Sequence, residues 1–262
     1  MKKRYLFFSL LILLIGFFSC DKKSENNSER CVCNLDPKSL DNVSVEQKEL
    51  DYFYSLMAYA VVYKDWQRSA EKRESRGYNI GSVLVNSNNR VVHWARNCVN
   101  RTLNETQHGE VRLMQSYLDK THEFSLKGYT IYTTLEPCAM CSGMMKLTEL
   151  YRTVYGQTDP AYGKALERLQ LESATCCEGG YSPYPRPVIS DKSPDSISVE
   201  IDLAYRRVGG HITQFLTTKE AEVLFRKATK MFMEYTDAKY PQNQRMIDEA
   251  HEFYIVRVEP VQ

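Results

Sequence analysis

The chain has 262 residues, which is enough for one sizeable domain with appended segments or for two small domains. Hydrophobic residues make up 43% and charged residues 26%, and these ordinary globular proportions exclude a disordered chain and a polytopic membrane protein. The formal net charge of +1 shows no general basic excess of the kind that phosphate-binding proteins carry.

The first 19 residues have the features of a secretory signal peptide. Residues 2–4 are all basic, and residues 5–18 are almost wholly apolar. This run is shorter than the ~20 apolar residues that span a bilayer, which favours a cleaved signal over a spanning helix. The site before Cys20 resembles the lipobox of bacterial lipoproteins, whose Cys is lipidated, although Phe17 stands where Leu is commoner. The alternatives are an uncleaved anchor and an ordinary signal peptide with a chance Cys.

We therefore expect an exported protein that is anchored to a bacterial membrane by lipid on Cys20, on the periplasmic or cell-surface side. Residues 20–43 are predicted to be a flexible tether, because they are polar and irregular. A single domain is expected over residues 44–236, with a loop insertion at about 176–196, and a helical extension over 237–262. Removing three basic residues with the signal from 34 basic and 33 acidic residues leaves a net charge of −2.

The remaining elements follow from periodicity and from turn residues. Ser44 is predicted to cap a first helix, with Gln47 as its capping-box partner. Strands are expected at 81–86, 90–95, 129–133, 152–155 and 198–203, and later helices at about 108–118, 137–145, 161–171, 218–235 and 242–253. A hairpin followed by strands that alternate with helices predicts an α/β fold. The expected architecture is a three-layer α/β/α sandwich with a mixed five-stranded sheet, whose last two strands are parallel.

Two short motifs point to chemistry: His108-Gly109-Glu110 and Pro137-Cys138-Ala139-Met140-Cys141. One imidazole and two thiolates supply the three protein ligands of a catalytic zinc, with the fourth position left for water. Both motifs are expected at helix N-termini, whose positive ends favour thiolates. Glu110 stands two residues from the histidine ligand and is predicted to carry protons between the water and a leaving amine.

Each motif is weak by itself, because Cys-x-x-Cys also occurs in redox sites and in zinc ribbons. Together, His-x-Glu and Pro-Cys-x-x-Cys form the signature of zinc deaminases. The main alternative at this level is a relative that has lost catalytic activity. The conjunction predicts a bound Zn²⁺ held by His108, Cys138 and Cys141, with Glu110 as the catalytic group.

The segment Thr133–Met144 closely resembles the cytidine deaminase-like superfamily, in the branch that includes tRNA adenosine, guanine and fungal-type cytosine deaminases. The resemblance extends over about residues 50–235. It implies that Asn97, eleven positions before the histidine, holds the base or ribose, and that the turn at Glu136 grips the substrate. A turn-forming role is the alternative for Asn97. Many relatives are dimers, so the resemblance also implies a homodimer.

The reaction that the resemblance implies is hydrolytic deamination of a free base or nucleoside such as cytosine, guanine or adenosine. Gly109 departs from the commoner His-Ala-Glu form and matches fungal-type cytosine deaminases, which favours a free base. One alternative is a deaminase that acts on DNA or RNA, either in tRNA editing or as a toxin. Export and the net charge of −2 argue against a polynucleotide substrate without excluding it. A non-catalytic zinc lipoprotein is the other alternative, and an intact Glu110 argues against it.

Overall fold

The computed structural model describes residues 43–175 and 178–259. The predicted signal peptide, Cys20 and nearly all of the predicted tether lie outside these residues. The chain divides into two units, Met1–Val32 and Cys33–Gln262, and every described residue belongs to the second. Within the described part of the chain, no helix is long and apolar enough to cross a membrane.

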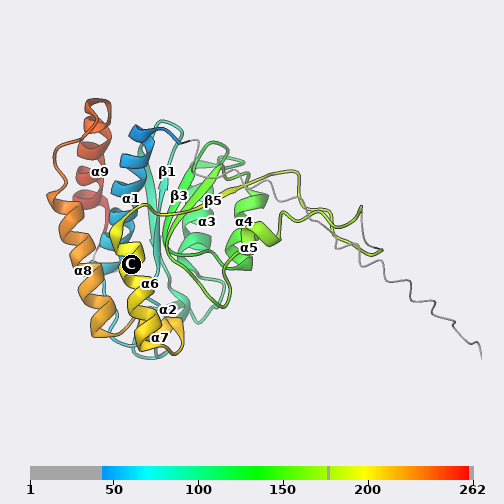
Figure 1. The fold of residues 1–262 in the computed structure, drawn as a ribbon, viewed down its shortest axis with the longest axis horizontal. Helices are drawn as coiled ribbons and strands as arrows, with labels where there is room; N and C mark the ends of the chain where they lie inside the picture. Colours follow the sequence, from blue (N-terminus) through cyan, green and yellow to red (C-terminus); the bar gives the residue numbers. More distant parts are fainter. Residues whose placement is uncertain (1–42, 176–177, 260–262) are drawn as a thin grey trace, which may run out of the picture. The chain divides into compact units, whose positions relative to one another are not determined.

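Strands and helices alternate along most of the second unit, as Figure 1 shows. In chain order the elements are α1 (Val45–Tyr63), β1 (Gly81–Val85), β2 (Val91–Arg96), α2 (Val99–Thr102), α3 (Gly109–Thr121), β3 (Thr130–Leu135), α4 (Ala139–Leu147), β4 (Arg152–Gln157), α5 (Ala165–Arg168), β5 (Ile189–Lys192), α6 (Ser196–Val208), α7 (Ile212–Phe215), α8 (Lys219–Glu234), the 3₁₀ turn η2 (Pro241–Asn243) and α9 (Gln244–Arg257).

The five strands form one mixed sheet in the order β2-β1-β3-β4-β5. β1 is antiparallel to both β2 and β3, whereas β3 pairs with β4, and β4 with β5, in parallel. The predicted fold class, including the parallel last pair, is therefore confirmed. Since β1 alone runs the other way, the carboxyl ends of β2, β3, β4 and β5 lie along the same edge of the sheet. This edge is where an α/β sheet usually places a functional site.

Helices cover both faces of the sheet because its central strands carry apolar residues on both sides. In β3, Tyr132 belongs to the core that contains α1, α6, α8 and α9, whereas the adjacent Ile131 belongs to the core that contains α3 and α4. Alternate residues of a strand face opposite sides, so the two cores are separated by the sheet. Figure 1 shows α1, α8 and α9 on one side of the sheet and α3, α4 and α5 on the other.

Helix α1 begins where the sequence predicts. The Ser44 side chain accepts a hydrogen bond from the backbone N–H of Gln47 at 3.2 Å, which satisfies one of the free donors of the first turn. From Phe53 to Val62 every residue of the helix is buried. Such a helix is covered all round, here by the sheet on one side and by α8 and α9 on the other.

The strand predicted at 198–203 is wrong, because these residues form part of α6. Asp195 caps this helix by accepting a hydrogen bond from the backbone N–H of Ser198 at 2.7 Å, and Ile197, Ile201 and Ala204 form its buried stripe. The fifth strand is instead Ile189–Lys192, inside the segment that was expected to be a loop insertion.

The helix predicted over 161–171 is also mostly wrong, since only Ala165–Arg168 is helical. Lys164 precedes it with a left-handed backbone, φ 56°, which cannot continue a right-handed helix from the residues before it. At the carboxyl end of the chain, α9 packs against α1, and Ile247, Ala250 and Tyr254 share a hydrophobic core with it. The predicted C-terminal extension thus contributes to the same core as the predicted domain.

Candidate metal centre and active site

The predicted metal ligands meet at the carboxyl end of β3. His108 is the N-cap of α3, Cys138 is the N-cap of α4, and Cys141 lies in the first turn of α4. Neither His108 nor Cys138 caps its helix with a side-chain hydrogen bond, so both side chains are available to bind something else. The two helix N-termini direct their positive ends toward the same point, which favours an arrangement containing thiolates.

The distances between the three ligand atoms fit a tetrahedral zinc site. The Sγ atoms of Cys138 and Cys141 are 3.7 Å apart, and each lies 3.6 Å from Nδ1 of His108. With zinc bonds of about 2.3 Å to sulfur and about 2.0–2.1 Å to nitrogen, tetrahedral ligand atoms are separated by about 3.5–3.8 Å. The triangle therefore has the size that zinc requires, and three protein ligands leave a fourth position open.

The two thiols stabilise one thiolate between them. The hydrogen bond between the two thiols lowers the pKa of Cys138 to about 4, and a further hydrogen bond with His108 adds to this effect. Metal ligands from cysteine must be deprotonated, so a thiol that ionises easily favours metal binding near neutral pH.

Glu110 lies beside this cluster without belonging to the triangle of ligand atoms. The residue is buried, with its Oε2 3.7 Å from Sγ of Cys141, while its Oε1 accepts a hydrogen bond of 3.1 Å from Oγ1 of Thr133. Burial raises the pKa of this carboxyl group. A carboxyl group held in this way is suited to exchange protons with a molecule at the open zinc position.

Thr133 also contacts the site, although no motif in the sequence predicted a role for it. It occupies β3, and its Oγ1 also accepts a hydrogen bond of 3.1 Å from Oγ of Ser82 in β1. Ser82 therefore holds the hydroxyl group of Thr133 in place, and this hydroxyl group orients the carboxylate of Glu110. No sequence signal singles it out, because the adjacent Thr134 is also a buried threonine.

Asn97 follows β2 directly, and only the oxygen of its side-chain amide is hydrogen-bonded within the described part of the protein. Its Oδ1 accepts hydrogen bonds from the backbone N–H groups of Tyr78 at 3.1 Å and Val99 at 3.3 Å. Arg76 donates to its backbone carbonyl. The Nδ2 atom is buried and has no hydrogen-bond partner among the described residues. The oxygen thus makes the turn that was expected as the alternative role, while a contact between the NH₂ group and a substrate stays a prediction.

Glu136 is buried, and both of its carboxylate oxygens bind a neighbouring loop. Oε2 accepts from the backbone N–H of Asp159 at 3.0 Å, and Oε1 accepts from that of Lys164 at 2.7 Å. A contact between this position and a substrate stays a prediction that depends on the backbone groups of the turn. The sequence did not predict the link to the loop, because the partners are far apart in the chain.

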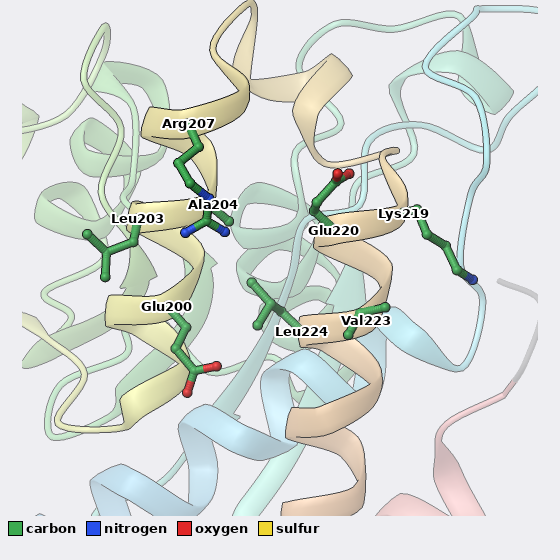
Figure 2. Close-up of a pocket in the computed structure, with 8 residues that line it drawn as sticks. All are labelled: Glu200, Leu203, Ala204, Arg207, Lys219, Glu220, Val223 and Leu224. Atoms are coloured by element: carbon green, nitrogen blue, oxygen red, sulfur yellow. The ribbon is translucent and has the colours of Figure 1, made fainter.

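A hollow of about 430 Å³ lies elsewhere, between α6 and α8, and Figure 2 shows the side chains around it. It is lined by Glu200, Leu203, Ala204 and Arg207 of α6 and by Lys219, Glu220, Val223 and Leu224 of α8. None of the predicted site residues lines it. The hollow is therefore separate from the predicted metal ligands.

Comparison with known proteins agrees with this site. Residues 56–157 match the family model described as the cytidine and deoxycytidylate deaminase zinc-binding region. The chain is 33% identical over 101 residues to the tRNA-specific adenosine deaminase of Bacillus subtilis, a match that covers 38% of this chain and 62% of that protein. It is 30% identical over 117 residues to the tRNA-specific adenosine deaminase of Agrobacterium fabrum, which covers 45% of this chain and 75% of that protein.

Among solved structures, a protein from a study of A-to-I editing by tRNA:A34 deaminases has 29% sequence identity. That similarity covers 52% of this chain and 95% of the other, with a TM-score of 0.38.

The match to the Bacillus subtilis relative spans less than two thirds of that protein, 62% of its length.

The ligand triangle, the adjacent carboxyl group and the mixed sheet define a deaminase-type zinc protein. The chain belongs to the cytidine and deoxycytidylate deaminase zinc-binding family. The matched range contains His108, Glu110, Cys138 and Cys141, so the predicted family and the predicted zinc cofactor are both confirmed.

Proposed function

We propose that this protein is a zinc-dependent hydrolytic deaminase that releases ammonia from a free nucleobase or a nucleoside. The observation that carries the proposal is the buried carboxyl group of Glu110 beside a ligand triangle of the size that zinc requires. A site that only stabilises the fold has no need of a proton carrier. In hydrolytic deamination the ring carbon gains a bond to the water oxygen and loses its bond to the amine nitrogen.

When bound, zinc would lower the pKa of a water and position it as the nucleophile. Glu110 takes one proton from the attacking water and passes it to the ring nitrogen. The same carboxylate then takes the second proton from the hydroxyl group that is now on the ring carbon and delivers it to the amine. The carbon–nitrogen bond breaks as the carbonyl group of the product forms, and the amine leaves as ammonia. Thr133 keeps the carboxylate in one orientation through both transfers. The N-terminal N–H groups of α3 and α4 favour negative charge at this point.

Asn97 supplies the polar contact that selects the substrate. Since its oxygen already accepts two backbone hydrogen bonds, only its NH₂ group is available, and this group can only donate. The matching substrate atom is therefore an acceptor, which means a ring nitrogen, a carbonyl oxygen or a hydroxyl oxygen. Nucleobases and nucleosides carry such atoms close to their amino group.

Replacing Asn97 with alanine is expected to lower kcat/KM by more than about tenfold, because a buried hydrogen bond to the substrate is lost. Steady-state ammonia release measures this effect. Asn100 is the matched control: it is also a buried asparagine, but its Nδ2 already donates to Oγ of Ser75 at 2.7 Å. An Asn97→Ala protein with unchanged kcat/KM would remove Asn97 from the substrate site.

The names of the similar proteins favour a second candidate, deamination of adenosine in tRNA or another polynucleotide. Two expectations from the sequence favour the small substrate instead: the net charge of −2 that removal of the predicted signal would leave, and the proposed export. Ammonia release from free bases, nucleosides and single-stranded RNA or DNA, at low and at physiological salt, separates these candidates. The small-substrate proposal predicts activity on bases or nucleosides with little salt dependence. Activity on polynucleotides alone, falling steeply with salt, would replace it. A zinc-loaded protein that is inactive on every substrate would support the non-catalytic alternative.

The location of the protein is a separate proposal, which depends on the sequence alone. We propose that the protein is exported and anchored by lipid on Cys20. Wild-type protein in bacterial cells is then expected to incorporate labelled fatty acid and to enter the detergent phase, whereas Cys20→Ser protein should do neither. Recovery of the wild type in the aqueous phase at its full unprocessed mass would contradict lipidation.

A further inference from the structure

The carboxylate of Glu136 holds the two ends of the loop between β4 and α5. Its two oxygens accept the backbone N–H groups of Asp159 and Lys164, and its own backbone N–H donates to the carbonyl of Gln157 at 2.8 Å. Glu136 stands two residues before the zinc ligand Cys138. The loop, residues 158–164, is therefore joined to the turn that carries the metal ligands.

The loop is also fixed internally. Oδ1 of Asp159 accepts the backbone N–H groups of Ala161 at 2.9 Å and Tyr162 at 3.0 Å. Gly163 passes so close to Glu136 that a Cβ atom there would lie 2.3 Å from its Oε2, and 2.4 Å from the carbonyl of Asp159. Only glycine permits this approach, so the backbone can fold tightly around the carboxylate.

A second carboxylate holds the beginning of the loop from α6. Asp202 accepts both the backbone N–H of Thr158, at 3.0 Å, and its hydroxyl group, at 3.1 Å. Lys192 of β5 pairs with Asp202 and donates to the same hydroxyl group at 3.2 Å. Both Asp202 and Lys192 lie outside residues 56–157, the range that matches the family. Elements beyond the family region thus reach a loop that borders the metal turn.

We propose that residues 158–164 form a preformed wall of the substrate site, and that Glu136 and Asp202 are its positioning residues. This inference rests on the proposed function. β3 and β4 are parallel neighbours, so the loop after β4 lies beside the ligand turn after β3. A wall that is ordered before the substrate arrives spares the cost of ordering it during binding, so it contributes to the affinity for the substrate.

The test uses three variants of buried carboxylates that bind backbone N–H groups of loops. Glu136→Gln and Asp202→Asn keep side-chain size, but each replaces one accepting oxygen with a donor. Glu49→Gln is the matched control: Glu49 is a buried carboxylate that accepts the backbone N–H groups of Lys239 and Tyr240, between α8 and η2. For each variant, hydrogen exchange of the loop amides, zinc content, kcat and KM are measured.

In Glu136→Gln, the amides of Asp159 and Lys164 are expected to exchange about tenfold faster than in the wild type, because a charge-assisted hydrogen bond is lost. KM should rise on the order of tenfold in both site variants, while kcat stays within about twofold and one zinc per chain remains. In Glu49→Gln, exchange should accelerate only between α8 and η2, with KM unchanged.

A second pair of variants retains every charge. Gly163→Ala introduces a methyl group against Glu136 and should raise KM as Glu136→Gln does. Gly143→Ala is its control, since a Cβ atom at that position of α4 meets nothing within 4 Å among the described residues. This pair decides the question if Glu136→Gln fails to fold.

Unchanged exchange at Asp159 and Lys164 in Glu136→Gln would overturn the positioning role of Glu136. If these amides exchange faster in Glu136→Gln but its KM is unchanged, the loop does not form a wall of the substrate site. An equal rise of KM in Glu49→Gln would assign the effect to general destabilisation and also overturn the proposal. A wild-type protein that releases no ammonia refutes the proposed function and the wall together, whereas the exchange measurement still decides whether Glu136 holds the loop.

Discussion

Replacing Glu110 with glutamine is expected to slow ammonia release by about 10²- to 10⁴-fold, the usual contribution of general acid–base catalysis. Glutamine has nearly the same size and can still accept the hydrogen bond from Thr133, but it cannot exchange a proton. The ligand triangle is untouched by this change, so zinc content should stay at one per chain. Turnover under saturating substrate and elemental analysis are the two measurements.

Thr133→Val is the companion variant, because it removes the hydroxyl group that orients Glu110 and leaves the carboxyl group in place. Its loss of turnover should be smaller than that of Glu110→Gln. Turnover that persists at the wild-type rate in Glu110→Gln would mean that another group carries the proton. Loss of zinc in the same variant would instead assign Glu110 a structural role at the metal.

The second large effect is expected at the metal itself. Cys141→Ala should bind almost no zinc and should have no measurable turnover, because two ligands remain and the open coordination geometry is lost. The ligands connect the N-termini of α3 and α4, so thermal stability should also fall. Elemental analysis and thermal unfolding measure these changes.

Cys98→Ala is the matched control for this experiment. Cys98 is also a buried free thiol, one residue after Asn97, but it is not a member of the ligand triangle. Its alanine variant should retain one zinc per chain. Full zinc occupancy in Cys141→Ala would contradict the ligand assignment, and loss of zinc in Cys98→Ala would show that zinc content reports general damage.

The sequence predicted correctly those parts of the fold that depend on residues close together in the chain. Ser44 caps α1 through a residue three positions away, and Asn88-Asn89 marks the turn between β1 and β2. The prediction failed at 198–203, where the apolar residues of a short segment fit a strand as well as a helix. The Asp195 cap and the buried position of Ala204 decide for a helix, but both lie outside the segment that suggested a strand.

In the site, too, only the residues within short motifs could be predicted. His108 and Glu110 belong to one short motif, and the two cysteines to another, so their spacing predicted the chemistry. Thr133 and Glu136 act through contacts with residues more than twenty positions away. Such contacts exist only after the strands have paired in their register, and one sequence contains no local signal for them. The sequence also could not predict that only the oxygen of the Asn97 amide is hydrogen-bonded among the described residues, because its partner Tyr78 lies in the loop before β1.

Helix α1 has a consequence for how the chain acquires its structure. Its buried face is covered by α8 and α9, and Glu49 near its beginning binds Asn243, 194 residues further along the chain. During synthesis α1 therefore emerges long before the helices that enclose it, and its apolar surface stays open to solvent until nearly the whole chain is available. Contacts between such distant segments form late and slowly, and an exposed apolar helix is prone to aggregate meanwhile. A chain that lacks α8 and α9 is therefore expected to aggregate more readily than the full-length chain.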